Sequence, residues 1–215
     1  MGDRIVRECR RCGVCCKKGG PTLHRADRRL VDEGIIPLNH LYTIRRGEPA
    51  YDNIAGAVFP VSDDLIKIKG AGDTWACLYY DDVLKGCRIY GDRPVECRIL
   101  KCWDTTAIEA MYRSDRLTRK DLIGGVPGLW DLVLDHQARC GYEEIGSLVA
   151  GIRQGEAASL ERLRTMVRYD GSLRQLVVEK GLTGTRMTDF LFGRPMVDTL
   201  KPMGVNVRDL RRHQT

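Results

Sequence analysis

Nine cysteines stand out among the 215 residues, because thiols bind soft metal ions and carry redox chemistry. Eight of them lie in the first 102 residues, and the remaining 113 residues hold only Cys140. A reducing cytosol keeps thiols reduced, so clustered cysteines indicate metal binding or catalysis rather than disulfides. We therefore expect a metal site. Its candidate ligands are Cys9, Cys12, Cys15, Cys16, Cys77, Cys87, Cys97 and Cys102.

The first four cysteines form the run Cys9-Arg-Arg-Cys12-Gly-Val-Cys15-Cys16. Two residues between successive cysteines allow a tight turn that aims the sulfurs at one centre, and Gly13 relieves strain there. The same spacing opens the bacterial ferredoxin pattern, but position 19, where that pattern has a cysteine, is glycine. The fourth ligand is therefore Cys16 or a distant cysteine. Adjacent cysteines point different ways in most backbones, so this pair serves two metals, or one of the two only supports the site.

The second group comprises the cysteines at positions 77, 87, 97 and 102. Pro94 and Glu96 predict a helix that begins near residue 92 or 93. Cys97 then lies in the first turn, where the free amides and two nearby arginines favour its thiolate. Cys102 points about 140° away on the same helix, so the two sulfurs cannot share one iron unless the helix ends between them.

These residues resemble the CxxCxxCC (YkgJ-type) family of zinc- or iron-chelating cysteine-cluster proteins. The family pattern continues with C-x-I-Y-x-x-R-P-x-x-C-R, which here runs from Cys87 through Ile89, Tyr90, Arg93 and Pro94 to Cys97 and Arg98. The resemblance covers roughly residues 9–102. Some members resemble iron–sulfur-containing flagellin lysine methylases, so it implies a redox or methyl-transfer setting.

An all-sulfur ligand set suits both an iron–sulfur cluster and zinc. A zinc ribbon uses two C-x2-C knuckles, and the second cysteine group contains none. A [4Fe–4S] cluster needs four thiolates and accepts a mixture of local and distant ones. We therefore favour at least one [4Fe–4S] cluster, with room for two, and keep zinc as the alternative.

The hydrophobic pattern predicts a mostly helical α+β fold. An irregular, metal-organised region over 1–103, with short strands, precedes a helical region over 104–215 that packs on it. In the first region we expect a helix over 23–34, a strand over 64–69, a turn over 70–73 and a partner strand over 75–80. In the second region we expect helices over 129–137, 143–153, 156–169, 172–180 and 207–213.

Other candidate residues have plainer interpretations. Cys140 is expected to be a small buried hydrophobe, and Tyr90 a packing wall over the cluster. The four histidines are scattered and are expected to be solvated or packed, although His24 is near enough to the cysteines to be a ligand. Residues 1–29 carry nine basic and three acidic residues, a surplus equal to the +6 of the whole chain. We expect this charge to offset the thiolates, or else to dock an acidic partner.

Three functions remain open. The first is an iron–sulfur protein that passes electrons as an accessory subunit of a partner enzyme. The second is a zinc-binding structural or interaction module, and the third is an iron–sulfur-dependent protein methyltransferase-like enzyme. No signal peptide, membrane span, nucleotide-binding loop or nucleic-acid motif is evident, so we expect a cytoplasmic protein that does not bind nucleic acid.

Overall fold

The computed structural model describes residues 9, 11–206 and 210 of the chain. Its strands are short and pair two at a time, all antiparallel, joining β1 to β4, β2 to β3 and β5 to β6. Local pairs of this kind bury little surface by themselves, so the strands depend on packing by other segments. The strands are β1 Leu41–Ile44, β2 Pro49–Asp52, β3 Ala57–Pro60, β4 Leu65–Ile68, β5 Tyr80–Asp81 and β6 Gly86–Cys87.

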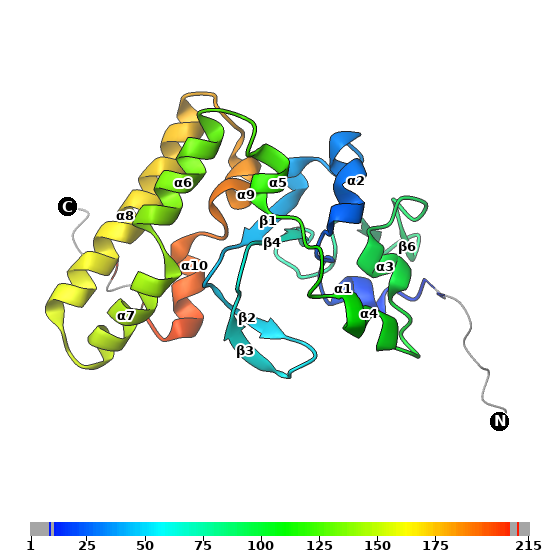
Figure 1. Cartoon of the computed structure of the whole chain (residues 1–215), viewed down its shortest axis with the longest axis horizontal. Helices are drawn as coiled ribbons and strands as arrows, with labels where there is room; N and C mark the ends of the chain where they lie inside the picture. Colours follow the sequence, from blue (N-terminus) through cyan, green and yellow to red (C-terminus); the bar gives the residue numbers. More distant parts are fainter. Residues whose placement is uncertain (1–8, 10, 207–209, 211–215) are drawn as a thin grey trace.

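Helices make up most of the regular structure, and the long ones lie in the C-terminal half (Figure 1). The chain is therefore α+β and mostly helical, as its sequence predicts. No described helix is long and apolar enough to cross a membrane. The α-helices are α1 Val14–Lys17, α2 Arg28–Asp32, α3 Val95–Ile99, α4 Thr106–Met111, α5 Arg119–Ile123, α6 Leu129–Arg139, α7 Tyr142–Arg153, α8 Ala157–Glu179, α9 Thr188–Phe192 and α10 Met196–Leu200.

The predicted helices are confirmed over 129–137 and 143–153, but the break predicted at residues 170 and 171 is wrong. Helix α8 runs through both residues without interruption. Asp170 is buried and accepts hydrogen bonds from His136 Nε2 at 2.8 Å, Arg174 Nε at 2.9 Å and Met196 N at 3.1 Å. These contacts hold Asp170 in the helix, whereas a turn would remove its carboxylate from all three donors. The helix predicted over 207–213 lies outside the described residues, apart from residue 210.

In the N-terminal half the strand predicted over 64–69 is confirmed as β4, and the helix predicted over 23–34 appears as a 3₁₀ turn, Arg25–Asp27, followed by α2. The predicted pairing partner of β4 is wrong. One edge of β4 pairs with β1, and the other takes hydrogen bonds from the segment before α2, including Leu23 N to Ile66 O at 2.8 Å. With both edges of β4 occupied, residues 75–80 do not join it. Cys77 forms a bridge with Gly70, Leu78 N donates to Lys69 O at 2.9 Å, and Tyr80 pairs with Cys87.

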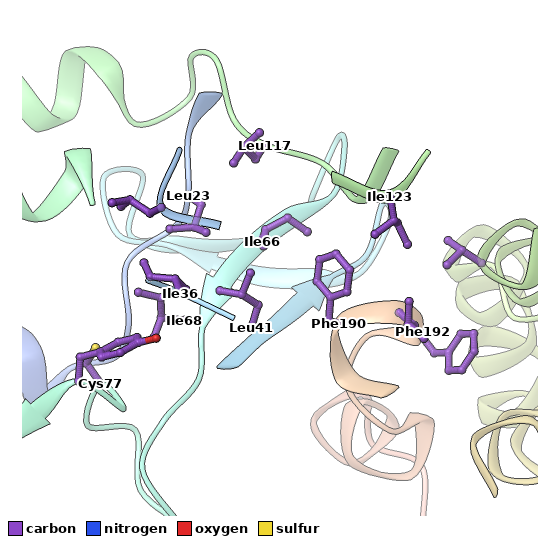
Figure 2. Packing of buried hydrophobic residues seen from close by; sticks show 14 of the residues in the cluster. Leu23, Ile36, Leu41, Ile66, Ile68, Cys77, Leu117, Ile123, Phe190 and Phe192 are labelled. Carbon is purple, nitrogen blue, oxygen red and sulfur yellow. The ribbon is translucent and has the colours of Figure 1, made fainter. Parts of the chain in front are cut away.

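The main hydrophobic core joins residues from both halves of the sequence. Leu23, Leu41 and Ile66 from the N-terminal half pack in one cluster with Phe190 and Phe192 from α9. Figure 2 shows Cys77 at one end of this cluster and Phe192 at the other. A second core lies among α7, α8 and α10. One continuous core thus connects the C-terminal helices to the cysteine-bearing end. The domain boundary between residues 103 and 104 stays a prediction.

A buried polar chain connects β1 to the long helices. The guanidinium of Arg45, which follows β1, donates to Cys140 O at 2.9 Å, and its Nη1 lies 3.5 Å from His136 Nδ1. The other nitrogen of His136 faces Asp170. A cation on one side and a carboxylate on the other assign the neutral tautomer with its proton on Nε2. Burial lowers the pKa of His136 to about 4, against the opposing effect of Asp170.

This shift predicts that acid weakens the fold through His136. The unfolded chain protonates the imidazole near pH 6.5, but the folded chain resists protonation down to about pH 4. The His136 contribution is complete above pH 6.5, and about 2.5 kcal/mol is lost on acidification to pH 4.5. Urea denaturation of wild type and His136→Gln between pH 7.5 and 4.5 should show a flatter pH dependence for the variant. Parallel pH profiles would contradict the assignment.

Candidate metal centre

Five of the eight predicted ligands come from four chain segments that meet at one end of the fold. Helix α1 carries Cys15 and Cys16, β6 carries Cys87, α3 carries Cys97, and Cys77 precedes β5. Backbone hydrogen bonds join three of these segments. Cys77 N donates to Cys16 O at 2.7 Å, and β5 pairs with β6 at Cys87. The short elements of this end are therefore assembled around their cysteines.

The five thiols interact with one another electrostatically. The Cys16 thiol donates a hydrogen bond to Cys15, which lowers the pKa of Cys15 to about 6. The same hydrogen bond raises the pKa of Cys16, and burial and the nearby Cys97 and Cys77 raise it further. Of the two thiols, Cys15 is therefore the easier to ionise. The two adjacent thiols lie together, contrary to the divergence expected from sequence.

Cys77 has backbone donors arranged for a thiolate. Its sulfur accepts hydrogen bonds from the backbone N–H groups of Tyr79 and Tyr80, which lower its pKa, although burial raises it overall. A tight turn that aims two amides at one sulfur stabilises negative charge on it, whether that charge arises by ionisation or by metal ligation. The turn after Cys77 is therefore suited to support a negatively charged sulfur.

Helix α3 begins close to the expected position, with Pro94 as its N-cap. The thiolate expected at Cys97 is not favoured. Burial raises the pKa of Cys97, and Cys77, Cys15 and Cys87 raise it further. The helix start is outweighed because burial disfavours the charged thiolate and neighbouring thiols repel its charge. A metal cation would reverse this balance by supplying the missing positive charge.

The remaining predicted ligands, Cys9, Cys12 and Cys102, are exposed, as is Cys15. Helix α3 ends at Ile99, so the helix break that would free Cys102 to turn towards Cys97 is present. Among the residues that the structure describes, no three His, Cys, Asp or Glu side chains are already placed as ligands of one metal ion. Metal binding therefore requires the thiols to turn towards one another.

The loop that contains the first four cysteines is shaped by Gly13. Its φ of 77° is in the left-handed region, which only glycine adopts at little cost. A Cβ on Gly13 would lie 2.2 Å from the Tyr80 hydroxyl, so the phenol fills the space that any other residue would need. The glycine thus permits both the turn and the close approach of Tyr80.

Tyr90 lies between two guanidinium groups rather than simply forming a wall. The Arg11 guanidinium is 4.0 Å from the ring centroid, and that of Arg93 is 3.7 Å from it. Arg93 also contributes to the lowered pKa of Cys15. Two cations are therefore held beside the thiols by one aromatic ring.

The basic surplus near the cysteines is partly neutralised within the protein. Four basic side chains of the first 29 residues pair with acidic side chains of neighbouring segments. The positive charge expected to compensate the thiolates must therefore come from the other basic residues, such as Arg11, and from Arg93. The ion pairs are Lys17–Asp82, Arg25–Asp121, Arg28–Asp32, Arg29–Glu33 and Arg29–Asp92.

The histidines of the described chain have structural roles. His24 Nδ1 donates to Ser114 O at 2.7 Å, and its Nε2 faces Glu96 at 3.2 Å, so neither nitrogen is left for a metal. Both partners are acceptors, and the pKa of His24 is accordingly raised, against its burial. Cys140 is fully buried in the second core, as expected for a packing residue. His213 lies outside the described residues.

The donor chemistry fits a metal centre. Five thiols at the same end of the fold are more soft ligands than one tetrahedral metal needs, and amides of Tyr79 and Tyr80 act on Cys77. The Tyr80 hydroxyl is buried beside the cysteine loop without a hydrogen-bond partner. Sequence reasoning missed Tyr80, although an aromatic residue three positions after a cysteine is a signal that could have pointed to it.

Comparison with known protein families also indicates metal binding. The model of the CxxCxxCC family, described as a putative zinc- or iron-chelating domain, matches residues 8–114. The match includes all eight candidate ligands. No curated protein and no solved structure matches the chain. Through residues 8–114, the chain belongs to the CxxCxxCC family of zinc- or iron-chelating domains.

Proposed function

We propose that the protein holds a [4Fe–4S] cluster and exchanges single electrons with a partner enzyme as an accessory subunit. The observation that carries this proposal is the meeting of five thiols from four segments at one end of the fold. Cys15, Cys16, Cys77, Cys87 and Cys97 form the inner set. The exposed Cys9, Cys12 and Cys102 complete the eight proposed ligands, with space for a second centre.

The arrangement of the thiols favours a cluster over a single zinc ion. Structural zinc sites draw on two compact knuckles, whereas here one compact loop meets three separated cysteines. A cubane cluster accepts such a mixture because it spreads its four ligand positions over a larger volume. When bound, it supplies a one-electron couple. Zinc in a structural module is the alternative, and it would use the same inner cysteines.

The chain's own residues have separable tasks at this centre. The amides of Tyr79 and Tyr80 stabilise charge on the Cys77 sulfur. Burial of Cys77 at the end of the main core limits access of water, while exposed Cys15 leaves one side near the surface. Arg93 provides compensating charge. A centre that is shielded on one side and close to the surface on the other is suited to exchange electrons with a docked partner.

The test is anaerobic purification followed by visible absorption and by iron, sulfide and zinc analysis. We expect a brown protein with iron and sulfide in equal amounts, bleached by one-electron reduction. A colourless protein with stoichiometric zinc would overturn the cluster and the electron-transfer role together. A cluster that no reductant can reduce would leave the cluster in place but overturn electron transfer.

A further inference from the structure

Tyr80 carries a buried hydroxyl that has nothing to bond. The side chain is 8% exposed, and its oxygen is among the few buried polar side-chain atoms without a partner in the part of the chain that the structure describes. Buried hydroxyls are normally satisfied, and one left alone destabilises the fold. The lack of an acceptor for the Tyr80 hydroxyl therefore needs an explanation.

The hydroxyl is aimed at the cysteine loop. It lies against Gly13, the residue directly after Cys12, in space that a Cβ would otherwise fill. Lys17 Nζ lies 5.6 Å from the ring centroid and is paired with Asp82, and an ammonium group offers no acceptor. What lies on that side of the phenol is the loop from Cys12 to Cys16.

Tyr80 also touches the other cysteine segments through its backbone. Its N–H donates to Cys77 O at 2.8 Å and contributes to the hydrogen bonds on the Cys77 sulfur. Within β5 it pairs directly with Cys87 of β6. One residue thus joins the strand pair that carries Cys77 and Cys87 to the cysteine loop.

We propose that the Tyr80 hydroxyl donates a hydrogen bond to a sulfur of the loaded metal centre. The acceptor sulfur would lie on the side of the centre that faces the loop from Cys12 to Cys16. This inference rests on the proposed metal centre and makes Tyr80 a positioning residue for it. Thiolate and sulfide sulfurs accept hydrogen bonds, and such bonds make a cluster easier to reduce because they stabilise added negative charge. Loading turns the thiols inward and supplies the acceptor that the metal-free protein lacks.

A packing role would need only the aromatic ring, so Tyr80→Phe separates the two explanations. In the metal-free protein, the variant loses a hydroxyl without a partner, and its Tm should rise by about 2–4 °C. In the loaded protein it loses a hydrogen bond. The rise in Tm on loading should therefore be smaller than in wild type, and the reduction potential should become more negative at unchanged iron content.

Tyr142→Phe is the matched control. The Tyr142 hydroxyl is buried in the second core and donates to Thr199 Oγ1 at 2.8 Å, so it is satisfied without a metal. Its removal should lower Tm equally in the metal-free and loaded proteins and leave the reduction potential unchanged. This variant shows the response of a phenol that serves only the fold.

The outcomes separate the two proposals. If loading raises the Tm of Tyr80→Phe as much as that of wild type, the Tyr80 hydrogen bond is overturned while the metal centre stands. If only zinc is taken up, electron transfer is overturned, but a smaller zinc-linked rise in Tm for Tyr80→Phe still supports the hydrogen bond. A chain that binds neither iron nor zinc would overturn both.

Discussion

Replacing Cys77 by serine is expected to remove the metal centre. Among the proposed ligands Cys77 is the one that is buried, and it interacts with two backbone amides and with Cys87. Serine preserves the size and the amide contacts but replaces a soft thiolate with a poor hydroxyl ligand. Even changes behind the ligands cost roughly 10–100-fold in metal affinity, so the loss here should exceed that range. Iron and sulfide content after anaerobic reconstitution measures it.

Cys140→Ser provides the control within the same chain. Cys140 is equally buried but lies in the second core, where its Sγ donates to Met166 O at 3.6 Å, a bond that a serine hydroxyl can replace. Metal content should stay at the wild-type level. Full iron content in Cys77→Ser would contradict the proposed ligand set. Comparing Cys9→Ser, Cys12→Ser and Cys102→Ser in the same assay ranks the exposed cysteines.

Replacing Asp64 by asparagine should destabilise the fold severely. Asp64 Oδ2 and Oδ1 accept hydrogen bonds from Arg119 Nε at 2.6 Å and Nη2 at 2.9 Å, and both side chains are buried. The same guanidinium donates to Leu191 O at 2.7 Å, which links the start of β4 to α5 and α9. Asparagine leaves the buried cation without its counter-charge, at a cost of about 3–5 kcal/mol. Urea denaturation measures the loss.

An exposed ion pair of the same geometry is the control. Arg162 Nε and Nη2 donate to Glu144 Oε1 and Oε2 at 2.6 and 3.1 Å, but both side chains are largely exposed. Glu144→Gln should cost no more than about 1 kcal/mol, because water solvates the remaining cation. Equal losses in the two variants would refute the role of burial. Removing both buried charges in Asp64→Leu/Arg119→Met should recover part of the stability lost in Asp64→Asn.

Local pattern in the sequence predicted the helices well where one apolar face is continuous, as in α6 and α7. It failed at Asp170 and Gly171, which often end helices. Here the helix continues because the buried Asp170 carboxylate accepts hydrogen bonds from other segments of the chain. It also failed for β4, because hydrogen-bonding edges are occupied by whichever segment packs there. Here that segment is the one around Leu23, and nothing in its residue pattern marks it as a neighbour of β4.

The candidate site also has some features that the sequence predicted and others that it could not predict. Cysteine spacing indicated the ligand types and the strain relieved at Gly13, because a C-x2-C turn is a property of a few consecutive residues. The sequence could not show that the Cys16 thiol donates to Cys15, or that Cys97 resists ionisation. The first depends on the side-chain conformations within α1, and the second on burial and on thiols that other segments bring close to Cys97.

By itself, the sequence determined that this chain has a thiol-rich N-terminal half, a helical C-terminal half and the cysteine pattern of its family. Only the tertiary structure decided which thiols meet, which helix stays continuous and where the Tyr80 hydroxyl points. The physical reason is the range of the interactions. Turns and helix faces are determined by neighbours along the chain, whereas electrostatic coupling and burial depend on contacts between residues that are far apart in sequence.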